Sequence, residues 1–402
     1  MHDGGSLRVE RPGHVPPERV VDFDVHNPPG GHEDLHGAWR RLQDGPDIVW
    51  APYHGGHWIV TRFEDIDYLQ RTHDPFSMRD VTMPSGTRPT RLLPLEADPP
   101  EHAAFRAILN PPFSPKRIAE LRDFTRDLAV RLIEGLLPRG ECEFMSEFAL
   151  QMPISIFLHL TALPLDDRAM LLRYTQMSTR GNAQQRGEAS RLMAAYLQPV
   201  IEARRAKPGT DLLSTVVHAR IDGKPLNETD LMSMLLVILF GGLDTVASTM
   251  GFIANFLAEN PSQRERLVAE PARIERAIEE LMRRFSPSST ARTLSRDFDY
   301  KGVHFRAGDK VYVSPILAGM DERRYPNAGT VDFDRRDMIH ASFGNGPHRC
   351  PGSLLARLEL RIFLEEWLKR IPVFGMKPGE KVLYGTGQVN CVERLVLAWP
   401  AR

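Results

Sequence analysis

The chain has few cysteines, no surplus of either charge and no long apolar run, and each absence excludes a class of protein. Its 402 residues include three cysteines, Cys142, Cys350 and Cys391. An odd, small number of cysteines is not a disulfide framework, so we expect reduced thiols and a cytoplasmic protein. With 51 basic and 52 acidic residues, the net charge of -1 argues against nucleic acid as a partner, because phosphate binding needs a basic surplus.

No segment of the sequence predicts a membrane span. The longest apolar run, Met234 to Phe240, is far below the roughly 18–20 residues that cross a bilayer. The first twenty residues, MHDGGSLRVERPGHVPPERV, lack the apolar core of a signal peptide and are rich in proline, glycine and charge. We expect a flexible arm over residues 1–20 and no association with a membrane.

Helical periodicity dominates the middle of the chain, from Asp98 to Phe285. Alternating apolar residues on either side of glycine turns predict pairs of strands elsewhere. These pairs are 48–61, turning at Gly55–Gly56, then 298–315, turning at Ala307–Asp309, and 381–399. The pattern predicts a mainly α protein with small peripheral β-sheets.

One expected helix runs from Asn227, which can cap it, to the residue before Pro261. About thirty residues at 1.5 Å each make a rod of roughly 45 Å. Its middle, MSMLLVILF, is apolar on every side. We therefore expect this helix to cross the domain and to be buried.

The centre of that helix contains residues that a buried helix disfavours. Gly241 and Gly242 each cost roughly 1 kcal/mol relative to alanine, and Asp244 and Thr245 place a carboxylate and a hydroxyl in the core. One interpretation is a kink at which Thr245 bonds back to its own backbone. The other is a functional site, because local departures from folding preferences concentrate at such sites.

A glycine-rich loop delivers Cys350 to the start of a helix beginning near Ser353. The amides and dipole of a helix N-terminus favour a thiolate, and glycines let the backbone pass close to a flat group. Phe343 can shield the sulfur, and His348 and Arg349 can donate to carboxylates. An anionic sulfur beside a wide ring fits haem iron. The alternative, a cysteine nucleophile for acyl transfer, needs a general base and an oxyanion hole that no motif supplies.

The segment FGNGPHRCPG resembles the cysteine loop of the cytochrome P-450 superfamily, F-G-x-G-x-H/R-x-C-x-G. Three further blocks agree with this resemblance in the expected order. They are His102 with Arg106, the GGLDT of residues 241–245, and Glu280 with Arg283 followed by Arg335.

The match narrows to the bacterial camphor 5-monooxygenase subfamily. DIVW…GGHWIVTR, ADPPEHAAFRAIL, RRAKPGTD and EELMRRFS are all similar to it, and the resemblance covers nearly the whole chain after the arm. It implies the cytochrome P-450 fold, with a single large haem-enclosing domain over residues 21–402. It also implies haem b, with Cys350 as the axial ligand of the iron.

The resemblance assigns roles to particular residues. It makes Asp244 and Thr245 the pair that delivers protons to dioxygen. Phe343 and Gly344 would adjoin the haem beside Cys350. Thr290 departs from the pattern, because it stands where the camphor enzyme has an acid, and Pro351 takes a position that is usually not proline. The propionates would be held by His102, Arg106, Arg292 and His348, and a structural ion-pair network would join Glu280, Arg283 and Arg335.

The implied substrate is a small apolar terpenoid, such as a monoterpenoid cyclic ether or ketone. The tyrosine that binds the camphor ketone is absent and Thr90 stands near its place, so a larger ionone-like terpenoid is the alternative. The other implied lining residues are Val237, Phe240, Gly241, Ser288, Gln388 and Val389.

The chain has no flavin or iron–sulfur segment, so we expect electrons from a [2Fe–2S] ferredoxin reduced by an NAD(P)H-dependent flavoprotein. Arg71, Arg106 and Arg349 are the expected docking residues on a monomeric enzyme. Rival interpretations are a non-oxygenating haem-thiolate sensor and a peroxide-using member of the same fold. The latter tends to lack the acid–alcohol pair that Asp244 and Thr245 supply.

Overall fold

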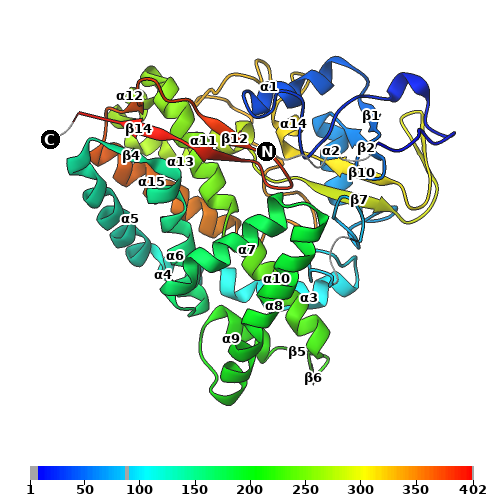
Figure 1. Ribbon diagram of the computed structural model, residues 1–402, viewed down its shortest axis with the longest axis horizontal. Helices are drawn as coiled ribbons and strands as arrows, with labels where there is room; N and C mark the ends of the chain where they lie inside the picture. Colours follow the sequence, from blue (N-terminus) through cyan, green and yellow to red (C-terminus); the bar gives the residue numbers. More distant parts are fainter. Residues whose placement is uncertain (1–7, 87–89, 401–402) are drawn as a thin grey trace.

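The computed structural model describes residues 8–86 and 90–400. Helices fill one side of the molecule and the largest sheet lies on the other (Figure 1). The α-helices of the described chain are α1 (Leu35–Arg40), α2 (Phe63–Arg71), α3 (Glu101–Leu109), α4 (Pro115–Glu120), α5 (Arg122–Leu136), α6 (Gln151–Thr161), α7 (Arg168–Arg180), α8 (Ala183–Ala206), α9 (Leu212–Val217), α10 (Glu228–Gly242), α11 (Thr245–Glu259), α12 (Pro261–Ala269), α13 (Ile274–Arg284), α14 (Pro315–Gly319) and α15 (Ser353–Arg370).

The strands are short and gather into small sheets. The largest sheet has five strands in the order β1-β2-β10-β7-β3, of which β2 and β10 run parallel. The strands are β1 (Ile48–Ala51), β2 (His57–Val60), β3 (Phe76–Ser77), β4 (Glu141–Glu143), β5 (Arg220–Ile221), β6 (Lys224–Pro225), β7 (Thr290–Leu294), β8 (Phe298–Tyr300), β9 (Val303–Phe305), β10 (Lys310–Val313), β11 (Gly375–Met376), β12 (Leu383–Gly385), β13 (Cys391–Arg394) and β14 (Val396–Ala398). The prediction of a mainly α fold with peripheral sheets is confirmed.

Two of the three predicted strand pairs are confirmed. In the third, the predicted position of the turn is wrong. β1 pairs antiparallel with β2 across Gly55–Gly56, where φ is 88° and 83°, and β12 pairs with β13. In the third pair the turn falls at Lys301–Gly302, between β8 and β9, rather than at 307–309. Both turn residues have positive φ, 48° and 74°, which suits a two-residue hairpin loop. β10 pairs with β2 and β7 instead.

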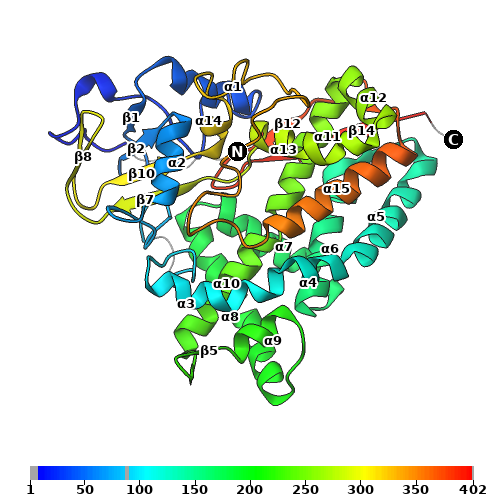
Figure 2. The same ribbon diagram turned by 180° about the vertical axis from the view of Figure 1, so that it is seen from behind.

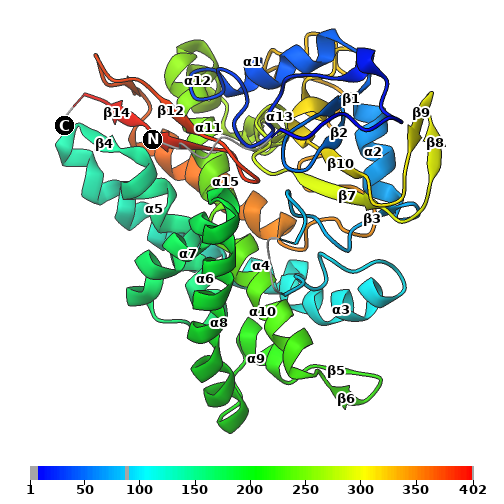
Figure 3. The same ribbon diagram turned by 45° about the vertical axis from the view of Figure 1, so that its right-hand side comes forward.

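The predicted central rod is two helices, α10 and α11, separated by Leu243 and Asp244. Asn227 caps α10 as expected, because its side chain accepts from the Asp230 backbone N–H. The stretch Glu228–Glu259 is long and apolar enough to cross a membrane, but 67% of its most apolar window is buried inside the molecule. It is the core helix pair, on which α6, α7, α8, α9 and α15 pack (Figure 3).

The expected N-terminal arm packs against the sheet from Val9 onward. The Val9 N–H donates to the Pro52 carbonyl at 2.8 Å, Val15 is fully buried, and Val20 forms a β-bridge with Trp50. Residues 1–7 lie outside the described residues. Residues 8–20 therefore pack as part of the single domain and do not extend away from it as an arm.

Helix α15 carries the cysteine loop at its N-terminal end and lies along α5 (Figure 2). Its inner face joins an aromatic cluster in which the Trp367 ring lies 5.1 Å from both Phe144 and Phe148. Large buried rings interlock with little freedom. This packing anchors the helix that directly follows the loop of Cys350.

Candidate functional site

The cysteine loop is a tight backbone turn that ends at Cys350. The Cys350 N–H donates to the Phe343 carbonyl at 2.8 Å, and Gly344 and Gly346 have φ of 70° and 80°. A Cβ at Gly346 would lie 2.8 Å from the Cα of Arg71, so the loop passes α2 too closely for any side chain there. The glycines of the motif FGNGPHRCPG thus stand where the loop needs positive φ and a close approach to α2.

Burial raises the pKa of the Cys350 thiol, while the Gly352 N–H and the guanidinium of Arg106 oppose that rise. A bound metal ion stabilises the anionic sulfur directly. Pro351 contributes no N–H, which leaves the Gly352 amide as the backbone donor to the sulfur.

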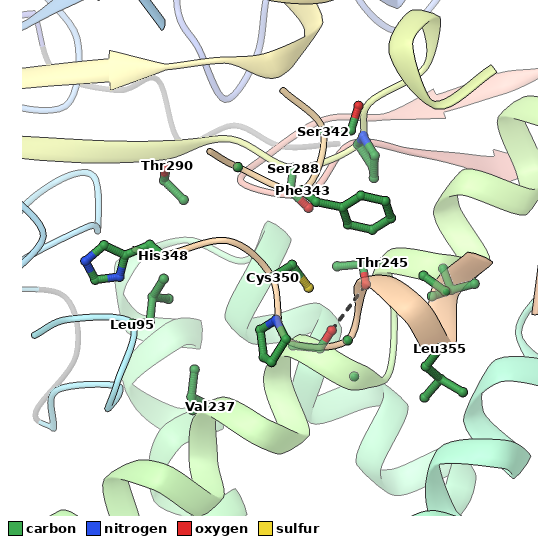
Figure 4. A pocket seen from close by; sticks show the side chains of 18 of the residues that line it. Leu95, Val237, Thr245, Ser288, Thr290, Ser342, Phe343, His348, Cys350 and Leu355 are labelled. Atoms are coloured by element: carbon green, nitrogen blue, oxygen red, sulfur yellow. Dashed lines mark hydrogen bonds between the residues drawn. The ribbon is translucent and has the colours of Figure 1, made fainter. Parts of the chain in front are cut away.

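The Cys350 side chain borders a cavity of about 370 Å³. Its walls come from the cysteine loop, α3, α10, α11, α15 and β7. In Figure 4, Cys350 lies between His348 at one end of the pocket and Leu355 at the other, with Val237 and Phe343 on opposite sides. Segments more than 200 residues apart in sequence thus enclose the sulfur (Figure 4).

Four basic side chains meet at one end of this cavity: His102 and Arg106 from α3, Arg292 from β7 and His348 from the cysteine loop. The rings of His102 and His348 are 4.2 Å apart. None of the four has an ion-pair partner in the described part of the chain. Burial lowers the pKa of Arg292 to about 10, and burial with the neighbouring cations lowers that of His348 to about 3.

This arrangement fits a haem. Arg292 is 3% exposed and donates only to Thr290 Oγ1 and the Ala291 carbonyl, and the buried Nε2 of His348 has no partner among the described residues. Such donors are stabilised by an anionic group with several acceptor oxygens. A haem offers iron to the Cys350 sulfur and two carboxylates to these donors.

Asp244 and Thr245 stand at the break between α10 and α11. Thr245 lines the cavity, and its hydroxyl donates to the Gly241 carbonyl at 3.2 Å (Figure 4). A Cβ on Gly241 would meet open space, whereas one on Gly242 would lie 2.2 Å from the Phe157 ring. Thr245 bonds back to its own backbone, as the kink interpretation expects, and it also faces the cavity, so its functional role stays a prediction.

The Asp244 carboxylate is 2% exposed and points away from this cavity. Its Oδ2 accepts from Arg180 Nη2 at 2.5 Å. Sequence reasoning missed Arg180, which lies 64 residues earlier at the end of α7. The residues around Arg180 form no motif in the sequence, so nothing there indicates that Arg180 pairs with Asp244.

Only some of the predicted substrate-lining residues border the cavity. Val237, Gly241 and Ser288 do, but Thr90, Phe240, Gln388 and Val389 do not, and their prediction as lining residues is corrected. Phe240 packs into the apolar core behind α10. The Gln388 N–H donates to the Thr179 carbonyl, and Val389 pairs with Ser288 through a β-bridge. Apolar lining residues that the prediction lacked are Met78, Leu95, Phe157, Ile238 and Val246.

Glu280, Arg283 and Arg335 come together in the core. Glu280 is fully buried and accepts from Arg283 Nε at 2.8 Å and from Arg335 Nε at 3.1 Å. The arginines also bond the Ala328, Thr330 and Pro326 carbonyls. The network thus ties α13 to the segment that precedes the cysteine loop.

The comparisons with known proteins agree with this site. The family model described as Cytochrome P450 matches residues 154–382. "Probable cytochrome P450 127A1" of Sinorhizobium fredii (strain NBRC 101917 / NGR234) is 35% identical and covers 96% of each chain. "Mycinamicin IV hydroxylase/epoxidase" of Micromonospora griseorubida is 31% identical over 84% of this chain and 88% of its own.

Solved structures are similar over nearly the full length. "Crystal Structure of Cytochrome P450 CYP101C1" matches with a TM-score of 0.90 and 37% identity, covering 98% of this chain and all of that one. "Crystal Structure of CYP101J2" matches with a TM-score of 0.89 and 36% identity at the same coverage. Fold and site together define a haem-thiolate monooxygenase that uses haem b. The chain belongs to the cytochrome P450 family.

Proposed function

We propose that this monooxygenase hydroxylates a small apolar terpenoid, such as a monoterpenoid cyclic ether or ketone. The observation that carries the proposal is the cavity wall beside Thr245, where Leu95, Val237 and Ile238 are apolar and Ser288 is a nearby hydroxyl. Apolar walls with one polar group orient a compact ligand with one weak acceptor. A larger ionone-like terpenoid is the second candidate.

The haem, when bound, activates dioxygen so that one oxygen atom enters a substrate C–H bond and the other leaves as water, using two electrons and two protons. Cys350 would ligate its iron, and Phe343 and Gly344 would pack beside the sulfur. His102, Arg106, Arg292 and His348 would hold its propionates through charge-assisted hydrogen bonds. The chain thus supplies position, charge and exclusion of water.

Asp244 and Thr245 would supply the protons. The Thr245 hydroxyl can release its bond to the Gly241 carbonyl and hold a water molecule in the cavity. The Asp244 carboxylate, one residue away, can pass a proton from its own side of the helix break. Their position favours an oxygenase over the sensor and the peroxide-using member, neither of which requires delivered protons.

Electrons would come from a [2Fe–2S] ferredoxin reduced by an NAD(P)H-dependent flavoprotein. Arg349 is exposed beside Cys350, and Arg71 lies where α2 meets the cysteine loop. Arg106 faces the cavity, so we assign docking to Arg349 and Arg71 and not to Arg106. Such contacts weaken as the salt concentration rises.

The experiment is a terpenoid panel scored by the haem spin shift, followed by turnover with a [2Fe–2S] ferredoxin and its reductase. A monoterpenoid ether or ketone should give the largest shift and a hydroxylated product. A haem spin shift seen with ionones alone would favour the larger ionone-like terpenoid as the substrate. Spin shifts without ferredoxin-dependent product would contradict the monooxygenase function, and absence of the thiolate band in the reduced carbon-monoxide spectrum would contradict the role of Cys350.

A further inference from the structure

Ser233 is the one polar residue between Leu231 and Phe240, in the apolar middle of α10, and it is 1% exposed. Ser233, Val237 and Gly241 are spaced four residues apart, so they share one face of the helix. Val237 and Gly241 line the cavity of about 370 Å³. The Ser233 hydroxyl therefore lies on the cavity face of α10, one helical turn beyond the lining residues.

The Ser233 hydroxyl holds a short turn of backbone, residues 91–96, which we call the wall segment. The hydroxyl accepts from the Leu93 N–H at 2.9 Å and donates to the Arg91 carbonyl. Leu95 of the wall segment lines the cavity and is labelled among the lining side chains in Figure 4. One buried hydroxyl thus satisfies a donor and an acceptor of the backbone that carries part of the cavity wall.

Glu96 joins the wall segment to the largest sheet. It is 4% exposed, and its Oε1 accepts from the Val81 N–H at 3.1 Å while its Oε2 accepts from the Leu92 N–H at 2.7 Å. Val81 is tied to β7, because its carbonyl accepts from the Ala291 N–H at 3.4 Å. Ser233 therefore fixes the wall segment to α10, and Glu96 fixes it to the sheet.

The wall segment keeps its shape through bonds of its own. The Glu96 N–H donates to the Leu92 carbonyl at 2.7 Å, and Arg91 Nη2 donates to the Glu96 carbonyl at 2.7 Å. Arg91 Nη2 also lies 2.9 Å from Glu101 Oε2 on α3. The turn is thus a compact unit, and its attachment to α10 and to the sheet depends on the side chains of Ser233 and Glu96.

Apolar packing alone does not fix where this unit lies. Leu92 and Leu93 are 3% and 2% exposed and belong to the same apolar cluster as Leu236 and Leu239 of α10. Apolar contacts have no preferred direction, so they let one surface slide over another. Hydrogen bonds require a narrow range of distance and angle, so the two polar side chains set the position of the wall segment.

We propose that Ser233 and Glu96 are positioning residues that limit the size of the substrate by holding Leu95 over the cavity. The proposal rests on the proposed function for the substrate class, because a compact terpenoid needs a narrow cavity. Without either side chain, buried peptide groups lose their partners, and the wall segment moves outward to reach water. The cavity then accepts longer ligands and holds compact ones less firmly.

Hydrogen exchange of the holoenzyme, resolved to single amides, tests the attachment to α10 without any substrate. In Ser233→Ala the Leu93 amide should exchange about tenfold faster than in the wild type. The matched control is Ser190→Ala, because Ser190 is a 4% exposed serine whose hydroxyl bonds the backbone of its own helix, α8. This control should keep the wild-type rate at Leu93. Wild-type exchange at Leu93 in Ser233→Ala would overturn the proposal.

The same measurement tests the attachment to the sheet. In Glu96→Ala the Val81 and Leu92 amides should exchange about tenfold faster, and Glu96→Gln, which keeps one acceptor oxygen, should have a smaller effect. The control is Glu101→Gln, since Glu101 contacts the wall segment only through the exposed side chain of Arg91. Wild-type rates at both amides in Glu96→Ala would remove Glu96 from the proposal.

Two azoles that ligate haem iron, phenylimidazole and the longer biphenylimidazole, measure the size limit independently of the substrate. The ratio of their Kd values, read from the shift of the haem absorption band, should move about tenfold toward biphenylimidazole in Ser233→Ala and in Glu96→Ala. A general loss of stability would weaken both azoles alike. Faster exchange with an unchanged ratio would show that the attachment does not set the size limit, and the proposal would be wrong.

The proposed function and this inference fail separately. If no terpenoid shifts the haem spin state while the azole ratio moves as expected, the substrate class is wrong and the roles of Ser233 and Glu96 stand. If terpenoids are hydroxylated while exchange and azole ratio keep their wild-type values in both variants, only the inference about Ser233 and Glu96 is wrong.

Discussion

The guanidinium of Arg357 lies 4.6 Å from the centre of the Phe343 ring. Glu279 holds it there through two hydrogen bonds, Nε to Oε1 at 2.6 Å and Nη2 to Oε2 at 2.8 Å, and His340 contacts Glu279 at 3.1 Å. A cation over an aromatic face restricts the ring. The contact links α13 and α15 to the loop segment that delivers Cys350.

Glu279→Gln should remove a pH-dependent part of the folding stability. Burial alone would raise the pKa of Glu279, but bonds from Arg357 and His340 outweigh it and lower the pKa from 4.5 to about 2. A lowered folded-state pKa gives stability that is complete above the unfolded value and lost as pH falls toward 2. Urea unfolding should show the variant about 3 kcal/mol less stable at pH 6, with the difference narrowing below pH 4.5.

The matched control is Glu275→Gln on the same helix, whose carboxylate pairs with Arg361 at the surface. It should change stability by less than about 1 kcal/mol. A Glu279→Gln difference that stays constant from pH 6 to pH 3 would contradict the assigned ionisation.

Thr245→Ala should uncouple electron consumption from product formation. Without the hydroxyl the cavity loses the group that we assign to hold water near dioxygen, so electrons are diverted to peroxide. The measurement is product and peroxide formed per reduced cofactor consumed, with Thr245→Ser as the control that keeps a hydroxyl. Wild-type coupling in the alanine variant would refute the assignment.

Glu280→Gln should destabilise the fold strongly. It leaves the buried guanidinium groups of Arg283 and Arg335 without their anion, a change that costs about 3–5 kcal/mol. Denaturant unfolding of the holoenzyme measures the loss. Glu270→Gln, in an exposed pair with Arg273, should stay within about 0.5 kcal/mol of the wild type, and a similar small effect in Glu280→Gln would disprove the network.

Pro351→Leu should raise the reduction potential of the haem. Leucine restores a backbone N–H beside the Cys350 sulfur, and a donor to the thiolate makes it a weaker electron donor to iron. One hydrogen bond of about 0.5–1.5 kcal/mol corresponds to roughly 20–60 mV for a one-electron couple. Spectroelectrochemical titration measures the shift, with Pro347→Ala in the same loop as the control; an unchanged potential in Pro351→Leu would rule out this effect.

Local patterns predicted the elements and motifs that depend on neighbours in sequence. The hairpin at Gly55–Gly56, the cap at Asn227 and the delivery of Cys350 by a glycine-rich loop follow from backbone preferences over a few residues. The turn at Lys301–Gly302 was missed, because the competing Gly308 turn has an equally favourable composition and strand pairing with β2 and β7 decided between them.

Which side chains of α10 point into the cavity depends on how distant segments pack against this helix. Phe240 and Val237 are three residues apart on one helix, yet Phe240 joins the core and Val237 faces the cavity. Helical periodicity alone places both on nearly the same face. Which of the two is buried depends on the helices packed behind α10.

By itself the sequence indicated a haem-thiolate monooxygenase, because the motifs that contain Cys350, Asp244 and Thr245 resemble those of the cytochrome P-450 superfamily in the expected order. Only the tertiary structure decided that Asp244 and Thr245 face separate cavities and that Arg180 pairs with Asp244. The physical reason is that a buried charge is satisfied by whichever opposite charge the fold brings near, and here that charge comes from 64 residues away.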